Sequence, residues 1–423
     1  MIIDTVIVGA GHAGLAVSRL LSDAGRDHVV LERGQVAERW RSERWDSLHL
    51  LTPNWMTRLP GWCYSGPDPD GYLSSSELVG HLERYAASFA APVITSAPVL
   101  EIAPSAGPGA ARFRVVTEAG TWQARHVVVA TGPYGQPRLP AAAAGIANGL
   151  RMITASAYRN PAALAPGGVL VVGASASGVQ IAQELVRAGR EVTLAVGRHT
   201  RVPRGYRGMD IFWWLDKTGR LARTVDDVRD VAAARQETSL QLIGNSDPLQ
   251  RGRDLDLEVL QALGVRLVGR LEKITGTAAA CRTDLEESVT AADRKMHRLL
   301  DAIDRYVENA GLDPEVLPPK RPGQIRLPNP TSLLDLAAEH IGTVLFATGY
   351  QPHFPWLHLP VLAPDGSIRQ RRGVTQIPGL YVVGQPFQHR RDSGYIDGAR
   401  HDARYVVDHL VGCRTASARV SAA

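Results

Sequence analysis

The chain has 423 residues, more than one ordinary hydrophobic core accommodates, so we expect two or three domains. Hydrophobic residues make up 44% and charged residues 21%, as in typical globular proteins, and no apolar run reaches the roughly 20 residues that a membrane span needs. The net charge of +5 comes with dispersed arginines, which favours basic cofactor pockets over nucleic-acid binding.

The N-terminal residues and the cysteines indicate a location and exclude one class of enzyme. The first residues lead directly into an apolar strand, which leaves no room for a signal peptide. Because no apolar run is long enough to span a bilayer, we also expect no membrane association. Cys63, Cys281 and Cys413 are far apart, which fits a reducing cytoplasm. Disulfide reductases that need a closely spaced redox-active pair are therefore excluded, and we predict no metal site.

The first glycine-rich turn predicts a dinucleotide site. Gly9, Gly11 and Gly14 follow the apolar run 5–8, and a helical pattern then leads to a second strand over 28–31. Such a turn brings backbone amides to a pyrophosphate at a helix N-terminus. Glu32 ends the second strand, where an acid hydrogen-bonds a ribose hydroxyl and repels a 2′-phosphate, so FAD or NAD is favoured. The alternative for Glu32 is a solvated side chain at a strand end.

The second turn predicts a site for NADPH. It follows the apolar run 169–172, and no acid ends the next strand over 191–196. Arginines come there instead, and a guanidinium matches phosphate oxygens in a bidentate fork. A basic surface loop is the alternative. The predicted NADPH-binding residues are Gly173, Ser175, Ala176, Ser177, Gly178, Arg198, His199 and Arg201.

Three further strands indicate how the domains are connected. The segments 126–132 and 343–349 both end in Ala-Thr-Gly, one before and one after the second turn, and 379–385 is another buried strand that ends in glycine. We therefore predict an α/β fold with two Rossmann-like domains, the NADPH domain being inserted in the FAD domain. The expected limits are 1–145 and 341–423 for the two parts of the FAD domain and 146–340 for the NADPH domain.

A helical insertion is expected at about 205–325. Thr283 and Glu286 read as a capping box that opens a long amphipathic helix, and Gly311 ends it. The insertion would either cover the flavin or form a homodimer contact. The aromatic run 212–214 would either line an apolar substrate pocket or belong to the core.

Taken together, these motifs resemble those of the class B flavin-dependent monooxygenases, which include flavin-containing monooxygenases, N-hydroxylases and Baeyer–Villiger enzymes. The resemblance covers nearly the whole chain. It rests on the two glycine turns, Glu32, the segment 40–50, Pro53 with Pro60, Tyr72-Leu73, both Ala-Thr-Gly strands and 379–384. It implies FAD in the first site, NADPH in the second and oxygen as co-substrate, with oxygenation of a small organic substrate through a C4a-peroxyflavin.

The resemblance also implies which residues lie around the flavin. Trp40 and Arg41 would line the FAD site, while Leu51 and Thr52 would pass the isoalloxazine, although Trp40 also reads as a core aromatic. Asn54 is the candidate catalytic amide. The remaining residues expected at FAD are Gly9, Gly11, Gly14, Glu32, Arg33, Thr131, Gly132, Gly384 and Gln385.

The chain departs from the family pattern at two positions. Thr154 stands where the family fingerprint has histidine, although the aromatic-basic end of that fingerprint is present as Tyr158-Arg159. Leu51 stands where N- and S-oxygenating members have asparagine. These departures keep open an alternative, an NADPH-dependent flavin oxidoreductase or oxidase that passes electrons to a quinone, an iron–sulfur protein or oxygen. A further alternative is not an enzyme but a redox-sensing protein that binds both dinucleotides only as structural ligands.

Overall fold

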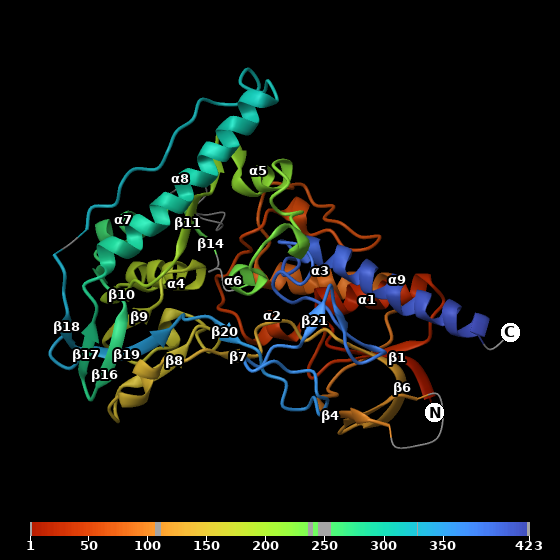
Figure 1. Cartoon of the computed structure of the whole chain (residues 1–423). Coiled ribbons are helices and arrows are strands. Elements are labelled where there is room, and N and C mark those ends of the chain that lie inside the picture. Colours follow the sequence, from red (N-terminus) through yellow and green to blue (C-terminus); the bar gives the residue numbers. More distant parts are fainter. Residues whose placement is uncertain (1, 106–110, 236–239, 244–254, 328, 421–423) are drawn as a thin grey trace.

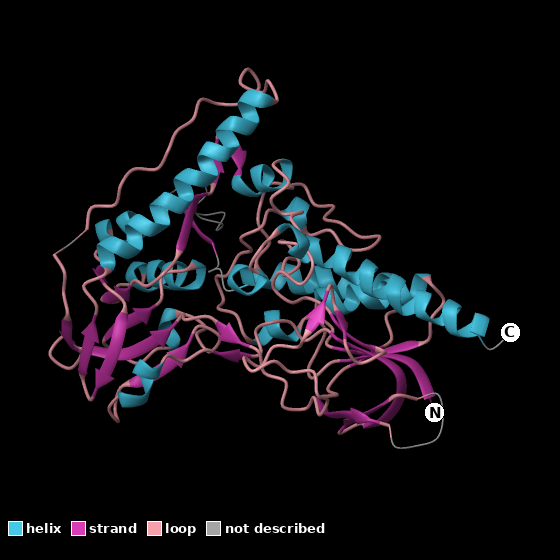
Figure 2. Ribbon diagram, viewed as in Figure 1, coloured by secondary structure: helices cyan, strands magenta, loops and turns pink. Residues whose placement is uncertain are grey.

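The computed structural model describes residues 2–105, 111–235, 240–243, 255–327 and 329–420. Figure 1 shows two lobes, each built around its own sheet, and Figure 2 shows the strands gathered in these two groups with helices above them. The predicted α/β class with two Rossmann-like units is confirmed.

The first lobe contains a nine-stranded sheet with β1 (Ile2–Val8) at its centre. Parallel neighbours of β1 are β2 (His28–Leu31) and β6 (Gly120–Val129). Helices α1 (His12–Asp23), α3 (Ser75–Ser88) and α9 (Ile396–Val420) share one hydrophobic core with the sheet. The other strands of this sheet are β3 (Val93–Ile94), β4 (Val99–Pro104), β5 (Phe113–Thr117), β21 (Gln370–Arg371), β22 (Val374–Thr375) and β23 (Leu380–Val382).

The second lobe contains a five-stranded parallel sheet in the order β15-β10-β9-β19-β8. Its strands are β8 (Arg151–Thr154), β9 (Gly168–Val172), β10 (Val192–Ala195), β15 (Arg266–Val268) and β19 (Ile341–Phe346). Helices α4 (Ala176–Arg187) and α7 (Leu257–Ala262) pack on it. A small antiparallel sheet of β16 (Leu271–Thr275), β17 (Ala278–Cys281) and β18 (Leu333–Asp335) lies beside it.

One predicted domain limit is wrong. Strand β19 pairs in parallel with both β9 and β8, so it belongs to the second sheet, whereas the expected limit at 341 assigned it to the first domain. The chain returns to the first lobe only after Phe346. The Ala-Thr-Gly that ends β19 resembles the one that follows β6, and this likeness hid the fact that the two strands belong to different sheets.

The two crossings between the lobes lie side by side. Strand β7 (Gln136–Pro137) follows β6, strand β20 (Tyr350–Gln351) follows β19, and the two pair antiparallel. Each crossing therefore starts at the carboxyl end of a central strand. The nested arrangement predicted from the sequence is present, with the second lobe inserted between β6 and β23 of the first.

The limits predicted for the helical insertion, about 205–325, are wrong in part, because α7, β15, β16 and β17 lie within them and belong to the second lobe. The other described elements of this insertion join the lobes above these crossings (Figure 1). The long helix α8 (Leu285–Asn309) runs along the second lobe, and α5 (Ile211–Lys217) lies near its far end. Phe212 and Trp214 are buried, so the aromatic run belongs largely to the core. The smaller elements are α2 (Glu38–Ser42), α6 (Val231–Arg235), β11 (Thr200–Pro203), β12 (Gly205–Tyr206), β13 (Met209–Asp210), β14 (Leu240–Ile243) and the short 3-10 turns 54–56, 141–145, 161–163 and 225–227.

The predicted capping box of α8 is wrong. The residue before the helix is Asp284, and its side chain makes no capping bond. Asp284 instead accepts a hydrogen bond from the Arg270 backbone N–H at 3.0 Å. The helix does end as expected, since Gly311 follows it with φ of +67°.

Candidate dinucleotide sites and the interface between them

The glycines of the first turn bring β1, β6 and α1 close together and leave one side open. A Cβ atom at Gly14 would lie 2.0 Å from the carbonyl oxygen of Gly9, and one at Gly9, where φ is +105°, would lie 2.9 Å from the Ala130 carbonyl oxygen. At Gly11 no described atom lies within 4 Å of an added Cβ. Gly11 directly precedes α1 and has no side chain that could accept hydrogen bonds from the first N–H groups of this helix. The open space faces uncapped backbone N–H groups, as a bound pyrophosphate requires.

Glu32 is part of this turn. It follows β2, is 7% exposed, and accepts hydrogen bonds from the N–H of Ala10 at 2.7 Å and of Gly34 at 3.3 Å. Burial raises the pKa of the Glu32 carboxyl, and these backbone donors oppose the shift. The alternative of a solvated glutamate is wrong, because the structure buries and orients this side chain. Its bond to a ribose hydroxyl stays a prediction.

The second turn repeats the first. Gly173 has φ of +108°, and an added Cβ would lie 2.6 Å from the Ala347 carbonyl oxygen. A Cβ at Gly178 would lie 1.8 Å from the carbonyl oxygen of Gly173. Ser175 precedes α4 and makes no side-chain cap, while Ala176 and Ser177 form the first turn of that helix. This helix N-terminus therefore also presents N–H groups that no described side chain caps.

The three residues predicted to hold the 2′-phosphate have different environments. Arg198 is exposed. His199 is buried, its Nδ1 lies 2.9 Å from the Gly197 carbonyl oxygen, and burial lowers its pKa, so it is neutral near pH 7. Arg201 is completely buried and pairs with Asp256 at 3.1 Å and with Asp293 at 2.6 Å. The structure thus uses Arg201 to hold α7 and α8, and of the three only Arg198 presents a charge at the surface.

The residues expected at the FAD site also separate into two groups. Trp40 on α2 is half-buried and packs against the cores of both lobes. Arg41 pairs with Glu83 of α3 at 2.7 Å, and Arg33 pairs with Glu43, both on the surface. Thr52 is half-buried. Trp40 therefore lies where the lobes meet, whereas the charges of Arg33 and Arg41 are directed to neighbouring acids.

The side-chain amide of Asn54 stabilises a loop. Its Nδ2 donates to the Asp68 carbonyl oxygen at 2.9 Å, and its Oδ1 accepts from the Leu73 N–H at 2.7 Å. The side chain is only 4% exposed. Both ends of the amide are engaged with the loop that Asn54 stabilises, so the catalytic role proposed for it has no support in this geometry.

The ends of β6 and β23 complete the first site. Gly132 has φ of +73° with open space around an added Cβ, and Gly384 has φ of +76° with the Cβ of Ala13 at 3.0 Å. Thr131 is half-buried. The Nε2 group of Gln385 is buried and has no hydrogen-bond partner within the described residues. An orphaned buried donor next to the open turn fits a bound flavin nucleotide.

His12 is a residue that the sequence reasoning missed. It is the first residue of α1, its Nε2 is buried without a partner among the described residues, and burial lowers its pKa to about 4. The side chain is therefore neutral, and it belongs to the residue that directly follows Gly11 of the glycine turn. Nothing in the sequence signalled it beyond its position inside the glycine motif, because the spacing of the glycines says nothing about the burial of the residues between them.

Two polar clusters hold the lobes together near the crossings. Glu184 of α4 accepts hydrogen bonds from Tyr158 Oη at 2.8 Å and from Ser47 Oγ at 3.0 Å, and burial raises its pKa. Arg159 donates to the backbone carbonyl oxygens of Ser42 and Arg44. The aromatic-basic pair thus fixes the segment after Trp40 against the second lobe.

The second cluster attaches the insertion to the segment that contains Leu51. Arg204 donates to the Leu51 carbonyl oxygen, lies 4.3 Å from the centroid of the Tyr72 ring, and is 3.6 Å from Asp210. Tyr72 Oη donates to Asp210 at 2.7 Å, and Asp210 caps α5. We call Arg204, Tyr72 and Asp210 the Arg204 cluster.

The chain is similar to proteins described as oxidoreductases. Residues 6–209 match the family described as pyridine nucleotide-disulphide oxidoreductase. The chain is 32% identical over 413 residues to an uncharacterized CzcO-like oxidoreductase of Geobacillus kaustophilus, a match that covers 97% of this chain and 99% of that protein. The chain belongs to the CzcO-like oxidoreductases.

More distant relatives and solved structures relate this family to flavin monooxygenases. Indole-3-pyruvate monooxygenase YUCCA1 of rice is 35% identical over 212 residues, about half of each chain. A double mutant of a flavin monooxygenase from Stenotrophomonas maltophilia shares the fold with a TM-score of 0.67 at 19% identity, covering 97% of this chain and 99% of the other. OTEMO, solved with FAD and NADP, aligns with a TM-score of 0.56 at 15% identity, covering 98% and 86%.

These matches confirm the expected kinship with class B flavin-dependent monooxygenases and the expectation that the CzcO-like chain is an oxidoreductase. The predicted cofactors agree with the two dinucleotides in the OTEMO structure. The two cysteines whose environments are described, Cys63 and Cys281, are both free, one exposed and one buried. None of the described helices is long and apolar enough to cross a membrane.

Proposed function

We propose that this CzcO-like protein is a cytoplasmic NADPH- and oxygen-dependent FAD enzyme that oxygenates a small organic molecule. The observation that carries the proposal is the pair of open glycine turns, which follow the parallel strands β1 and β9 of the two sheets. The strands next to them, β6 and β19, continue into the two paired crossings. Ligands of such sheets bind outside the carboxyl ends of the strands. This topology supports two dinucleotides bound near each other.

The residues around each turn suit one cofactor. The N–H groups after Gly11 would bind the FAD pyrophosphate, Glu32 a ribose, and Gln385 Nε2 the flavin. The N–H groups after Ser175 would bind the second pyrophosphate and Arg198 the 2′-phosphate of NADPH. When bound, NADPH supplies a hydride to FAD, and the reduced flavin activates oxygen for transfer to a substrate.

The protein's own part in this chemistry is to exclude water and to hold the lobes in register. The insertion core, which contains Phe212 and Trp214, packs against Met56 and the half-buried Leu51 of the first lobe. The Arg204 cluster adds hydrogen bonds at the same contact. A flavin beside Leu51 would thus be covered by an apolar layer, which protects reactive oxygen species from water.

A second candidate function is the NADPH-dependent oxidoreductase or oxidase without oxygenation. The state of Asn54 favours it, because both ends of that amide are already bonded and Leu51 offers no amide. Such a site would have fewer neutral donors to hold activated oxygen. The relatives named as monooxygenases support the first candidate.

Product analysis under labelled oxygen separates the two candidates. The purified holoprotein would be given NADPH, ¹⁸O₂ and a panel of amines, thioethers and ketones. We expect one ¹⁸O atom in a product and a matching decrease in hydrogen peroxide. If every panel member leaves all the oxygen as peroxide, the oxidase function replaces the proposed one. If NADPH is not consumed even when a quinone and an iron–sulfur protein are added as electron acceptors, both are excluded.

A further inference from the structure

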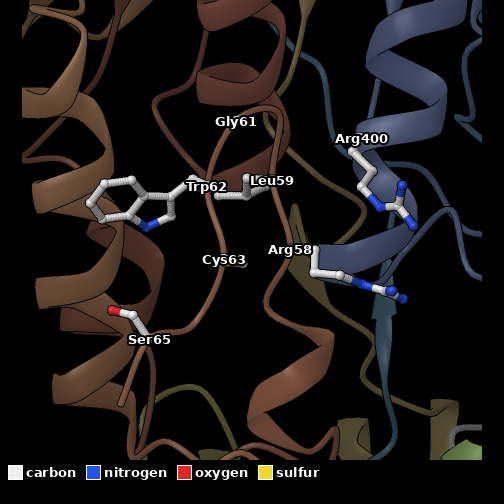
Figure 3. Close-up of a pocket in the computed structure, with 7 residues that line it drawn as sticks. All are labelled: Arg58, Leu59, Gly61, Trp62, Cys63, Ser65 and Arg400. Carbon is white, nitrogen blue, oxygen red and sulfur yellow. The ribbon is translucent and has the colours of Figure 1, made fainter.

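A cavity of about 470 Å³ lies on the first lobe, apart from the residues assigned to the cofactors. Figure 3 shows it between the loop that carries Arg58, Trp62 and Cys63 and the start of α9, which carries Arg400. The two guanidinium groups lie on one side and the Trp62 indole on the other, with Cys63 between them. Basic groups, an apolar wall and an exposed thiol thus share one cavity.

One buried carboxylate fixes both guanidinium groups. Arg58 donates Nε and Nη2 to the two oxygens of Asp397, each at 2.7 Å, and Arg400 donates Nε to the same carboxylate at 3.0 Å. Asp397 is 3% exposed. Together, Arg58, Arg400 and Asp397 carry one net positive charge. Nη1 of Arg58 and both terminal nitrogens of Arg400 have no hydrogen-bond partner among the described residues, and both arginines are partly exposed. These donors are available to a ligand.

The charged groups around the start of α9 also give this region a positive electrostatic potential. His401 follows Arg400, and its pKa is lowered to about 4, first by burial and then by Arg390, Arg400 and Arg58, against the opposing charge of Asp397. Asp392, another acid nearby, is held by Arg390 at 3.0 Å. Asp216 also acts on Arg58 and offsets part of its charge. At His401 the cationic charges outweigh the acidic ones.

The apolar side of the cavity is held firmly. The Trp62 ring packs against Tyr85 and His81 of α3, with centroids 5.9 Å apart in each case. Leu59 adds aliphatic surface. A planar guanidinium fork recognises a carboxylate, and an indole wall recognises an apolar or aromatic body. We infer that this cavity binds a small organic carboxylate with an apolar body, its anionic group on Arg58 and Arg400.

Alkylation of Cys63 tests this inference without turnover. Iodoacetate and iodoacetamide differ in charge but react with a thiol in the same way. The two rates at Cys63 would be measured on the holoprotein by peptide mass spectrometry, with glutathione as the reference thiol. We expect the iodoacetate-to-iodoacetamide ratio to be on the order of threefold higher at Cys63, and to fall to the glutathione value in ~0.5 M NaCl. Phenylacetate should protect Cys63, and benzyl alcohol should not.

Two variants on α9 give the matched comparison. Arg400→Gln should bring the ratio close to that of glutathione, since it removes one of the two charges at the cavity. Arg404→Gln, one turn further along and also exposed, should keep the wild-type ratio. A wild-type ratio equal to that of glutathione, equal losses in the two variants, or no protection by phenylacetate would each overturn the inference. Because the protein is not turning over, these results are independent of the proposed oxygenation.

Discussion

At the residue scale, the glycines of the first turn have different roles that only the structure separates. Gly14 is needed for the fold, because its Cα approaches the Gly9 carbonyl oxygen too closely for any side chain. Gly11 has ordinary extended backbone, with φ of −80°, and open space around it. The fold therefore does not require a glycine at this position, and the open space fits the pyrophosphate that we propose binds here.

This difference gives a direct test of the FAD site. Gly11→Val should fold and stay soluble but purify without flavin, because the branched side chain would occupy the space of the pyrophosphate. Visible flavin absorbance and circular dichroism measure the two properties. Gly14→Ala is the contrasting variant and should fold poorly. Full flavin content in Gly11→Val would remove this turn from the proposal.

Arg198, which we propose binds the 2′-phosphate of NADPH, gives a second test. Arg198→Ala should raise the KM for NADPH by roughly ten- to a hundredfold, equivalent to about 1.5–3 kcal/mol for a charge-assisted hydrogen bond, and leave NADH nearly unchanged. Arg201→Ala should instead lower the unfolding free energy by about 3–5 kcal/mol, since it leaves Asp256 and Asp293 without their buried cation. Equal losses for NADPH and NADH in Arg198→Ala would indicate a structural role.

Asp402 gives a prediction about pH. It is completely buried, burial raises its pKa to about 7, and neither of its carboxylate oxygens has a hydrogen-bond partner within the part of the chain that the structure describes. The folded state therefore holds one proton more than the unfolded state between about pH 4 and pH 7, so stability falls as the pH rises through this range. Asp402→Asn should abolish this decrease, which is about 2–3 kcal/mol between pH 5 and pH 8. Melting temperatures of both proteins at these pH values would show it. Parallel pH curves would exclude Asp402 as the source.

The sequence predicted the site residues unevenly, for a physical reason. Both glycine turns and Glu32 were predictable because strand, turn, helix and acid are adjacent in the chain. Arg198 and Arg201 looked alike, since both are cations on one short loop. The burial of Arg201 depends on Asp256 and Asp293, which folding brings from α7 and α8. Local spacing carries no information about such partners.

At the element scale, the insertion is held to the first lobe by the Arg204 cluster and by packing of α5. The sequence predicted a helical insertion that covers the flavin or joins two subunits. Its core contains Met56 and packs against Leu51, which favours the covering role. The start of α8 was not predictable, because the capping preference of Thr283 is weak and Asp284 is recruited by the distant Arg270 N–H.

Weakening this attachment should uncouple NADPH use from product formation. Arg204→Met keeps the volume and removes the hydrogen bond to Leu51, so water should reach the reduced flavin and peroxide release per NADPH should rise severalfold. Arg207→Met is the matched control, because Arg207 pairs with Asp304 and Asp313 inside the insertion. Peroxide and NADPH measured together provide the readout. An equal rise in both variants would point to general loosening.

At the scale of the whole molecule, the two lobes meet through paired crossings, Trp40 and the bonds that Glu184 makes to Tyr158 and Ser47. The nested order of the domains was predictable from the two Ala-Thr-Gly strands. The limit at 341 was not, because strand identity depends on hydrogen-bonded neighbours and not on the tripeptide that follows. Glu184 also escaped notice, since its partners lie far from it in the chain.

The nesting has a consequence for synthesis on the ribosome. Every strand of the second sheet has been made once Phe346 emerges, so the inner domain can complete its core at that point. The outer sheet must wait for β23, which pairs with β6, and α1 stays uncovered until α9 follows. The N-terminal glycine turn is thus made first but finished last. A nascent chain stopped before β23 would expose the apolar face of α1 and be a substrate for chaperones.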